Sequence, residues 1–193
     1  TYRAEPSATT RHMTEFMHID MEVCFTDLKN LIDLVGDLLK NVVDRVWENS
    51  KSELSLWEAT KPILPKEIPV MTMSEIHEKY SAVNEQQTIG EKDLRPDEER
   101  WICEYVKDNL ESEAVFVTEW PAGEMKFYHR ANADNKEVAD RVDLLFRGVE
   151  ITTGSMRENN YKTIVDQLVK LAKGDPKDPG FEPLLSAMKY GMP

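Results

Sequence analysis

Polar and apolar side chains alternate strictly near the start of the chain, and this pattern constrains the fold more than any other. Between Glu15 and Val23, one set comprises Phe16, His18, Asp20 and Glu22, and the other comprises Met17, Ile19, Met21 and Val23. Because successive side chains of a strand point to opposite faces of a sheet, the pattern predicts a strand with one face in the core. The other face is either a ligand-binding face or the solvated polar face of a half-exposed strand.

Helical spacing begins directly after this strand. Apolar residues recur every three or four positions from Leu28 to Trp47, which predicts a helix with Thr26 as its N-cap. Shorter helices are expected at 71–80, capped by Ser74, and at 95–109, where Pro96 and acidic residues favour the helix start. Two more are expected at 161–171 and at 183–190.

Extended segments and turns fill the remaining sequence. Residues 49–69 contain three prolines and are interpreted as a connection, whereas strands are expected at 114–118 and 125–129 around a turn at 121–123. Strands that follow one another through hairpins, with helices inserted between them, are typical of an α+β fold. The expected fold is therefore an antiparallel β-sheet flanked by helices. The GxGxxG and P-loop motifs of parallel nucleotide-binding sheets are absent from the sequence.

The first strand carries side chains that suit ATP. Arg3 and Arg11 precede it, and guanidinium forks match phosphate oxygens. Phe16, on the polar face, offers a ring on which a base can stack. One face of this strand therefore indicates a nucleotide site.

A second candidate site lies in the run Asp143-Leu-Leu-Phe-Arg-Gly-Val-Glu150. Arg147-Gly148 suits a two-residue hairpin turn, which places Leu145 opposite Glu150 and Asp143 diagonally from Glu150 on the same face. Diagonal neighbours lie about 7–8 Å apart, so both carboxylates can reach one divalent ion. The plainer alternative is a pair of surface acids on a hairpin.

Composition limits the function classes. The 193 residues, of which 40% are apolar, suit one globular domain, and no apolar run is long enough to cross a membrane. The net charge of −12 argues against general nucleic-acid binding, since that needs clustered Lys and Arg. Cys24 and Cys103 lack metal-ligand or disulfide spacing, which fits a reducing cytosol.

The run YRAEPSATTRHMTEFMHIDMEV (residues 2–23) resembles the second signature motif of class II aminoacyl-tRNA synthetases. Within that class it is similar to the aspartyl and asparaginyl branch, and most to archaeal and eukaryotic aspartyl enzymes. The resemblance implies roles for residues throughout the motif. Arg3 holds the ATP α-phosphate, Glu5 works near adenine and the acceptor end of tRNA, and Phe16 stacks on adenine. Arg11 and His12 reach the outer phosphates, and Asp20 binds the amino acid.

The later run DLLFRGVEITTGSMR (residues 143–157) resembles the segment that carries the magnesium acids and the side-chain arginine of the same enzymes. By this resemblance Asp143 and Glu150 bind Mg²⁺, Glu150 also contributes to ATP binding, and Arg157 grips the carboxylate of the substrate side chain. Arg3 and Arg157 are the residues expected to act in catalysis.

The resemblance covers nearly the whole sequence but only the middle of a catalytic domain. The first and third signature motifs lie outside residues 1–193, as does an anticodon-binding domain, so this segment alone is expected to be inactive. A helical, acidic insert is expected at about 50–112; residues 85–125 hold twelve acids and four bases. Asn159 stands where aspartyl enzymes usually have a histidine, whereas the spacing from Asp143 to Glu150 and the YGMP ending are similar to the aspartyl type.

The resemblance implies an aspartate–tRNA ligase. It uses ATP and Mg²⁺, acts on tRNA largely through regions outside this segment, and works as a cytoplasmic homodimer without a membrane. The same-class alternative is an asparaginyl-tRNA synthetase or a related asparagine synthetase that uses the adenylate. The alternative from another class is a non-catalytic paralogue that binds nucleotide or amino acid for regulation.

Overall fold

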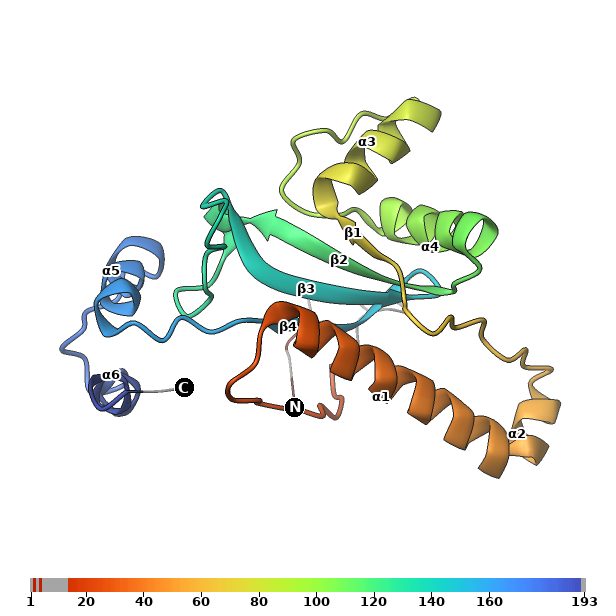
Figure 1. Ribbon diagram of the computed structural model, residues 1–193, viewed down its shortest axis with the longest axis horizontal. Coiled ribbons are helices and arrows are strands. Elements are labelled where there is room, and N and C mark those ends of the chain that lie inside the picture. The colour runs from red at the N-terminus through yellow and green to blue at the C-terminus, as the bar shows by residue number, and fades with distance from the viewer. Residues whose placement is uncertain (1, 3, 5–13, 192–193) are drawn as a thin grey trace.

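The computed structural model describes residues 2, 4 and 14–191, which form a four-stranded sheet with helices on both faces (Figure 1). The strands, in the order in which they pair, are β1 (Val70–Thr72), β2 (Ala114–Pro121), β3 (Val138–Phe146) and β4 (Val149–Ser155). Pairs β2–β3 and β3–β4 are antiparallel, as the sequence predicts. The pair β1–β2 is parallel, so the sheet is mixed and the purely antiparallel expectation is wrong at this edge.

Helix α1 (Leu28–Asn49) covers one face of the sheet (Figure 1). Its N-cap is Asp27, whose carboxylate accepts a hydrogen bond of 2.7 Å from the Asn30 amide, and not the neighbouring Thr26. The apolar stripe of α1 packs on Phe116, Val142 and Leu144. A further short helix, α2 (Lys51–Leu56), forms inside the stretch expected to be a connection.

Helices α3 (Met73–Val83) and α4 (Pro96–Leu110) cover the opposite face (Figure 1). The capping box of α3 joins Thr72 and Glu75, so the cap lies two residues before the expected Ser74. Alternate residues of β2 serve the two cores, because Val115 and Val117 face α3 and α4. This explains why β2 is apolar from Ala114 to Val117 and does not alternate there.

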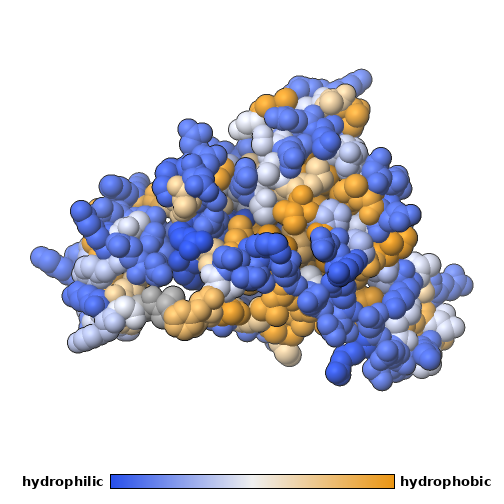
Figure 2. All heavy atoms as spheres, viewed as in Figure 1, coloured by the Kyte–Doolittle hydropathy of each residue, from blue (hydrophilic) through white to orange (hydrophobic). Residues whose placement is uncertain are grey.

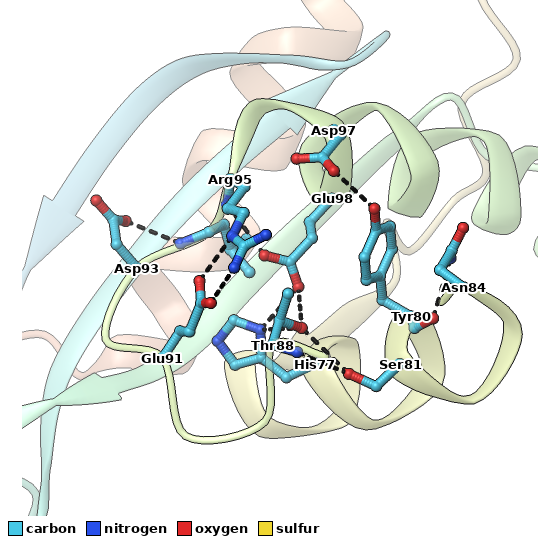
Figure 3. A network of polar contacts seen from close by, with 11 residues as sticks. His77, Tyr80, Ser81, Asn84, Thr88, Glu91, Asp93, Arg95, Asp97 and Glu98 are labelled. Atoms are coloured by element: carbon cyan, nitrogen blue, oxygen red, sulfur yellow. Dashed lines mark hydrogen bonds and ion pairs between the residues drawn. The ribbon is translucent and has the colours of Figure 1, made fainter. Parts of the chain in front are cut away.

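A buried polar network ties the loop after α3 to both helices (Figure 3). Glu98 is fully buried and its Oε1 accepts hydrogen bonds from Thr88 Oγ1 at 2.7 Å and from His77 Nδ1 at 2.8 Å. Its Oε2 accepts from the Arg95 amide at the start of α4, at 3.1 Å. Residues 84–95 are therefore anchored from inside the α3–α4 layer.

The C-terminal helices form a smaller cluster beside the sheet (Figure 1). Helices α5 (Tyr161–Leu171) and α6 (Glu182–Lys189) pack on Phe127 and Tyr128, which follow the short 3-10 helix η1 (Ala122–Glu124). The strand expected at 125–129 is absent because the backbone turns there, with the His129 amide donating to the Lys126 carbonyl. An isolated antiparallel β-bridge between His129 and Arg157 connects this stretch to the residues that follow β4.

The segment 14–27 does not form the expected strand. Glu15 makes a bridge to Tyr2, and residues 16–23 are not assigned to a strand; their side chains are exposed except for the half-buried Phe16. Met17 and Ile19 are 92% and 94% exposed. In Figure 2, apolar spheres gather along the lower middle of the molecule, where Figure 1 draws this segment and α1. The prediction of a core-facing side is wrong here, because a strand face becomes core only when a neighbouring strand and a packing layer cover it.

Candidate active site

The candidate site lies along the paired strands β3 and β4, and Asp143 is its most buried carboxylate. Asp143 is fully buried and receives three hydrogen bonds: 2.6 Å from Arg141 Nη2, 3.2 Å from Arg141 Nε and 2.6 Å from Thr153 Oγ1. Burial raises the pKa of Asp143, while Arg141 and the Thr153 hydroxyl oppose that rise. The carboxylate is thus held in a dry position by a cation and a hydroxyl.

Arg141 is held from its other side by Trp120. The guanidinium carbon lies 4.0 Å from the centre of the indole ring, within the range of a cation–π contact. Trp120 faces Arg141 because the register of β2 shifts between Thr118 and Trp120, where Glu119 adopts a left-handed φ of 58°. Bulges of this kind turn a side chain to a chosen face, and this one places the indole beside the Arg141–Asp143 pair.

The β3–β4 hairpin has the predicted turn. Arg147 and Gly148 have φ values of 49° and 80°, and Leu145 pairs with Glu150, so both predictions are confirmed. The register shifts after Leu144, and Ile151 has no partner in the ladder, which places one extra residue between Asp143 and Glu150. Glu150 is exposed, unlike Asp143. Within residues 2, 4 and 14–191, no cluster of three or more metal-binding side chains is found.

Arg157 brings together three segments that are far apart in sequence. Its backbone pairs with His129, its guanidinium lies 4.5 Å from the ring centre of Tyr128, and its Nη2 lies 3.2 Å from Glu22 Oε1. The side chain is 49% exposed, so part of the guanidinium faces solvent. Asp20, the other residue expected to bind the amino acid, is exposed on the same 14–27 segment as Glu22.

His129 belongs to this site and sequence analysis assigns it no role. Burial, together with the nearby charges of Arg157, Arg141 and Lys126, lowers its pKa to about 4. The imidazole is therefore neutral at neutral pH amid three cations, a setting that favours an anionic ligand. In the sequence, His129 stands out only by lying next to Arg130 and near Lys126. Its pairing with Arg157 is formed by the fold and cannot be read from the sequence.

The remaining predicted site residues are spread unevenly over the structure. Phe16 is half-buried and its ring lies edge-on to His18, 4.6 Å between ring centres. Arg3, Glu5, Arg11 and His12 fall outside the described residues. The geometry thus joins the 14–27 segment to Arg157 through Glu22, and places Asp143 on the neighbouring strand.

Comparison with known proteins decides the family. Residues 1–193 match the sequence model of tRNA synthetases class II (D, K and N). The chain belongs to the class II tRNA synthetase family. This synthetase chain is 35% identical over 202 residues to the aspartate–tRNA(Asp/Asn) ligase of Deinococcus radiodurans, covering 100% of the chain and 45% of the relative. It is 34% identical over 194 residues to the aspartate–tRNA(Asp) ligase of Pyrococcus abyssi, covering 100% of the chain and 43% of the relative.

The fold of the synthetase chain is shared with solved structures. The asparaginyl-tRNA synthetase from Pyrococcus horikoshii, complexed with asparaginyl-adenylate, superimposes with a TM-score of 0.85 at 28% identity over 98% of this chain and 43% of that one. The mixed sheet and its flanking helices are therefore those of a class II catalytic domain, which confirms the α+β expectation. The synthetase chain spans less than half the length of these relatives.

Proposed function

We propose that this chain is the catalytic portion of an aspartate–tRNA ligase. In the first half-reaction a carboxylate oxygen of aspartate attacks the α-phosphorus of ATP, the bond to pyrophosphate breaks, and aspartyl adenylate forms. In the second, the terminal hydroxyl of tRNA takes the aspartyl group and AMP leaves. The names of the relatives support this assignment. The observation that carries it is the half-exposed guanidinium of Arg157, stacked on Tyr128 beside His129.

Arg157 is proposed to bind the side-chain carboxylate of aspartate. A guanidinium offers a planar, two-pronged donor set that matches a carboxylate, and its stacking on Tyr128 fixes the plane of the fork. Glu22 occupies part of that fork at 3.2 Å, with both side chains partly exposed. The substrate carboxylate takes over this contact when it binds. Asp20, on the same segment, is proposed to bind the amino acid as well.

ATP binding is assigned to the segment that precedes the 14–27 segment and to Phe16. Arg3 is proposed to hold the α-phosphate, Arg11 and His12 the outer phosphates, and Glu5 to work near adenine. Phe16 is proposed to stack on adenine. The rate gain comes from holding the reacting groups in line and from neutralising phosphate charge, and no covalent protein intermediate is needed.

Asp143 and Glu150 are proposed to hold Mg²⁺ together with ATP, and Glu150 to contribute to ATP binding. The donor set fits in one observed respect: the buried Asp143 carboxylate already holds a cationic partner, Arg141. Mg²⁺ commonly uses one or two carboxylates plus substrate phosphates, which fits an acidic pair on one hairpin. When bound, the ion supplies positive charge that draws the phosphates into an ordered geometry.

The wider setting is proposed on the same basis. The protein acts in the cytoplasm as a homodimer and engages tRNA mostly through regions beyond residues 1–193, and residues 50–112 form an acidic helical insert of the catalytic domain. Among the described residues, the structure has no helix that is long and apolar enough to cross a bilayer.

A second candidate is an asparaginyl-tRNA synthetase or an adenylate-using asparagine synthetase. It is favoured by the 28% identity and the TM-score of 0.85 to an asparaginyl enzyme bound to its adenylate. The charge of Arg157 argues for aspartate, because a guanidinium binds a carboxylate more strongly than a neutral amide.

Amino-acid-dependent exchange between pyrophosphate and ATP tests the proposal. The full-length protein should exchange label with aspartate and not with asparagine. Exchange with asparagine alone would support the second candidate. Binding of aspartate or ATP without exchange would support a non-catalytic, regulatory protein.

A further inference from the structure

The pairing of Arg141 with Asp143 leaves no oxygen of that carboxylate unused. Oδ1 accepts from Thr153 Oγ1 at 2.6 Å and from Arg141 Nε at 3.2 Å, and Oδ2 accepts from Arg141 Nη2 at 2.6 Å. Asp143 itself is fully buried, so solvent does not reach it from another side. Any cation that binds this carboxylate therefore meets Arg141 first.

Electrostatic repulsion prevents Arg141 and a divalent ion from pairing with Asp143 at the same time. A buried carboxylate needs a positive partner, since leaving it uncompensated in a dry site is costly. A divalent ion beside the guanidinium adds the opposite problem, because two like charges a few ångströms apart in a poorly solvated site repel strongly. Asp143 thus has room for one cationic partner at a time.

Arg141 has a second anchor that allows it to move. Its guanidinium lies 4.0 Å from the ring centre of Trp120, and its side chain is 25% exposed whereas Asp143 is not. Stacking against a flat ring does not fix the rotation of the guanidinium in its own plane, unlike the two-pronged contact with the carboxylate. Arg141 can therefore release Asp143 while keeping contact with the indole and gaining solvent.

We propose that Arg141 is a positioning residue that acts as an exchangeable counter-charge: it covers Asp143 in the ligand-free site and leaves the carboxylate when a divalent cation binds there. This inference rests on the proposed function, because it takes Asp143 as one of the metal-binding acids. Arg141 compensates the charge of the Asp143 carboxylate when no divalent ion is bound, and it lowers the affinity for divalent ions that arrive without the nucleotide.

A second arginine–carboxylate pair, whose carboxylate also lies on β3, provides the control. Arg130 Nε lies 2.8 Å from Asp140 Oδ2, and Asp140, 5% exposed, also accepts from Asn132. Asp140 lies on β3, three residues before Asp143, and its partner Arg130 lies in the loop that precedes this strand. Its arginine is not expected to compete with a metal at Asp143.

Binding of Mn²⁺ alone to the full-length protein, followed by electron paramagnetic resonance of the unbound ion, tests the competition. Arg141→Gln should bind Mn²⁺ at least tenfold more tightly than the wild type, and Arg130→Gln should match the wild type. Adding Asp143→Asn to Arg141→Gln should abolish the gain. Melting temperatures give a second readout: Arg141→Gln should melt lower than the wild type without Mn²⁺ and gain more on its addition.

If Arg141→Gln does not fold, Arg141→Lys can be used for the same Mn²⁺-binding measurement. A lysine keeps the charge but lacks the two-pronged fork, so its Mn²⁺ affinity should lie above that of the wild type and below that of Arg141→Gln. Unchanged or weaker Mn²⁺ binding in the Arg141 variants, with wild-type binding lost in Asp143→Asn, would overturn the inference and leave the metal assignment standing. Wild-type binding that is insensitive to Asp143→Asn would overturn both.

Discussion

At the scale of single residues, the proposed contact between Arg157 and the side-chain carboxylate of aspartate can be tested by substitution. Its side chain is 49% exposed and pairs with Glu22 and Tyr128, so replacement by Leu removes a ligand contact with little loss of packing. A charge-assisted hydrogen-bonded pair is worth about 1.5–3 kcal/mol, so Arg157→Leu should weaken aspartate binding about 10- to 150-fold. ATP binding, measured by calorimetry in the same samples, should change little. The aspartate affinity of Arg157→Lys should lie between that of the wild type and that of Arg157→Leu. Equal loss of aspartate and ATP affinity would mean that Arg157 is structural.

His129 gives the site a pH dependence. Its pKa falls to about 4 in the folded chain, from an ordinary value of 6.5, through burial and neighbouring cations. The unfolded chain therefore binds the proton more readily, and the contribution of His129 to the free energy of unfolding shrinks as pH drops from 6.5 toward 4. In urea titrations, the wild type should lose stability over this range more steeply than His129→Gln. Parallel curves for the two proteins would contradict the lowered pKa.

At the scale of elements, the α3–α4 layer depends on the network around Glu98. Glu98→Leu removes the carboxylate that accepts from the Thr88 hydroxyl, the His77 imidazole and the Arg95 amide, and leaves only the longer contacts of Thr88 with His77 and Ser81. Each orphaned buried donor costs about 1–3 kcal/mol, so the variant should lose about 3 kcal/mol or more of unfolding free energy. Glu104→Leu, an exposed change on the same helix, should stay within about 0.5 kcal/mol of the wild type.

The location of that loss is also testable. Hydrogen exchange in Glu98→Leu should rise first in residues 84–95, because this loop is held by Thr88 and Arg95 from within the network (Figure 3). Protection that falls evenly across the sheet and helices instead would show that the network does not act on the loop in particular.

Elements with a strong local pattern were predictable from the sequence. The periodicity of α1 and α4, the apolar run of β2 and the Arg147–Gly148 turn depend on near neighbours, and each appears where expected. Strand β1 has three residues and exists through its parallel pairing with Phe116–Thr118, more than forty positions away, which no local pattern reports. The alternating 14–27 segment shows the converse: a local strand pattern does not by itself bury one face, and Met17 and Ile19 are exposed.

The candidate site was predictable to the same degree. The motifs single out Arg157, Asp143 and Glu150, and the hairpin register joins the last two to one turn. The Arg141–Asp143–Trp120 stack and the neutral His129 depend on the bulge at Glu119 and on the turn at 126–129. Both features set which face a side chain takes, and a register shift of one residue reverses that face.

At the scale of the whole molecule, apolar side chains remain on the surface of the described chain. Among them are side chains of the 14–27 segment and of one stripe of α1, where Leu34, Leu38, Val42 and Val46 are 40–50% exposed. Contiguous apolar surface of this kind promotes association. Residues 1–193 produced alone should self-associate in sedimentation, and Leu38→Ser with Val42→Ser should reduce it. A monomer at all concentrations would contradict this expectation.

Charging of tRNA by the full-length protein tests the central claim most directly. With ATP, Mg²⁺, unfractionated tRNA and labelled amino acid, the wild type should form acid-precipitable aspartyl-tRNA, and Arg157→Leu should form far less at the same aspartate concentration. The product should contain aspartate and not asparagine. Formation of asparaginyl-tRNA, or no charging with either amino acid by a protein that still binds ATP, would contradict an aspartate–tRNA ligase.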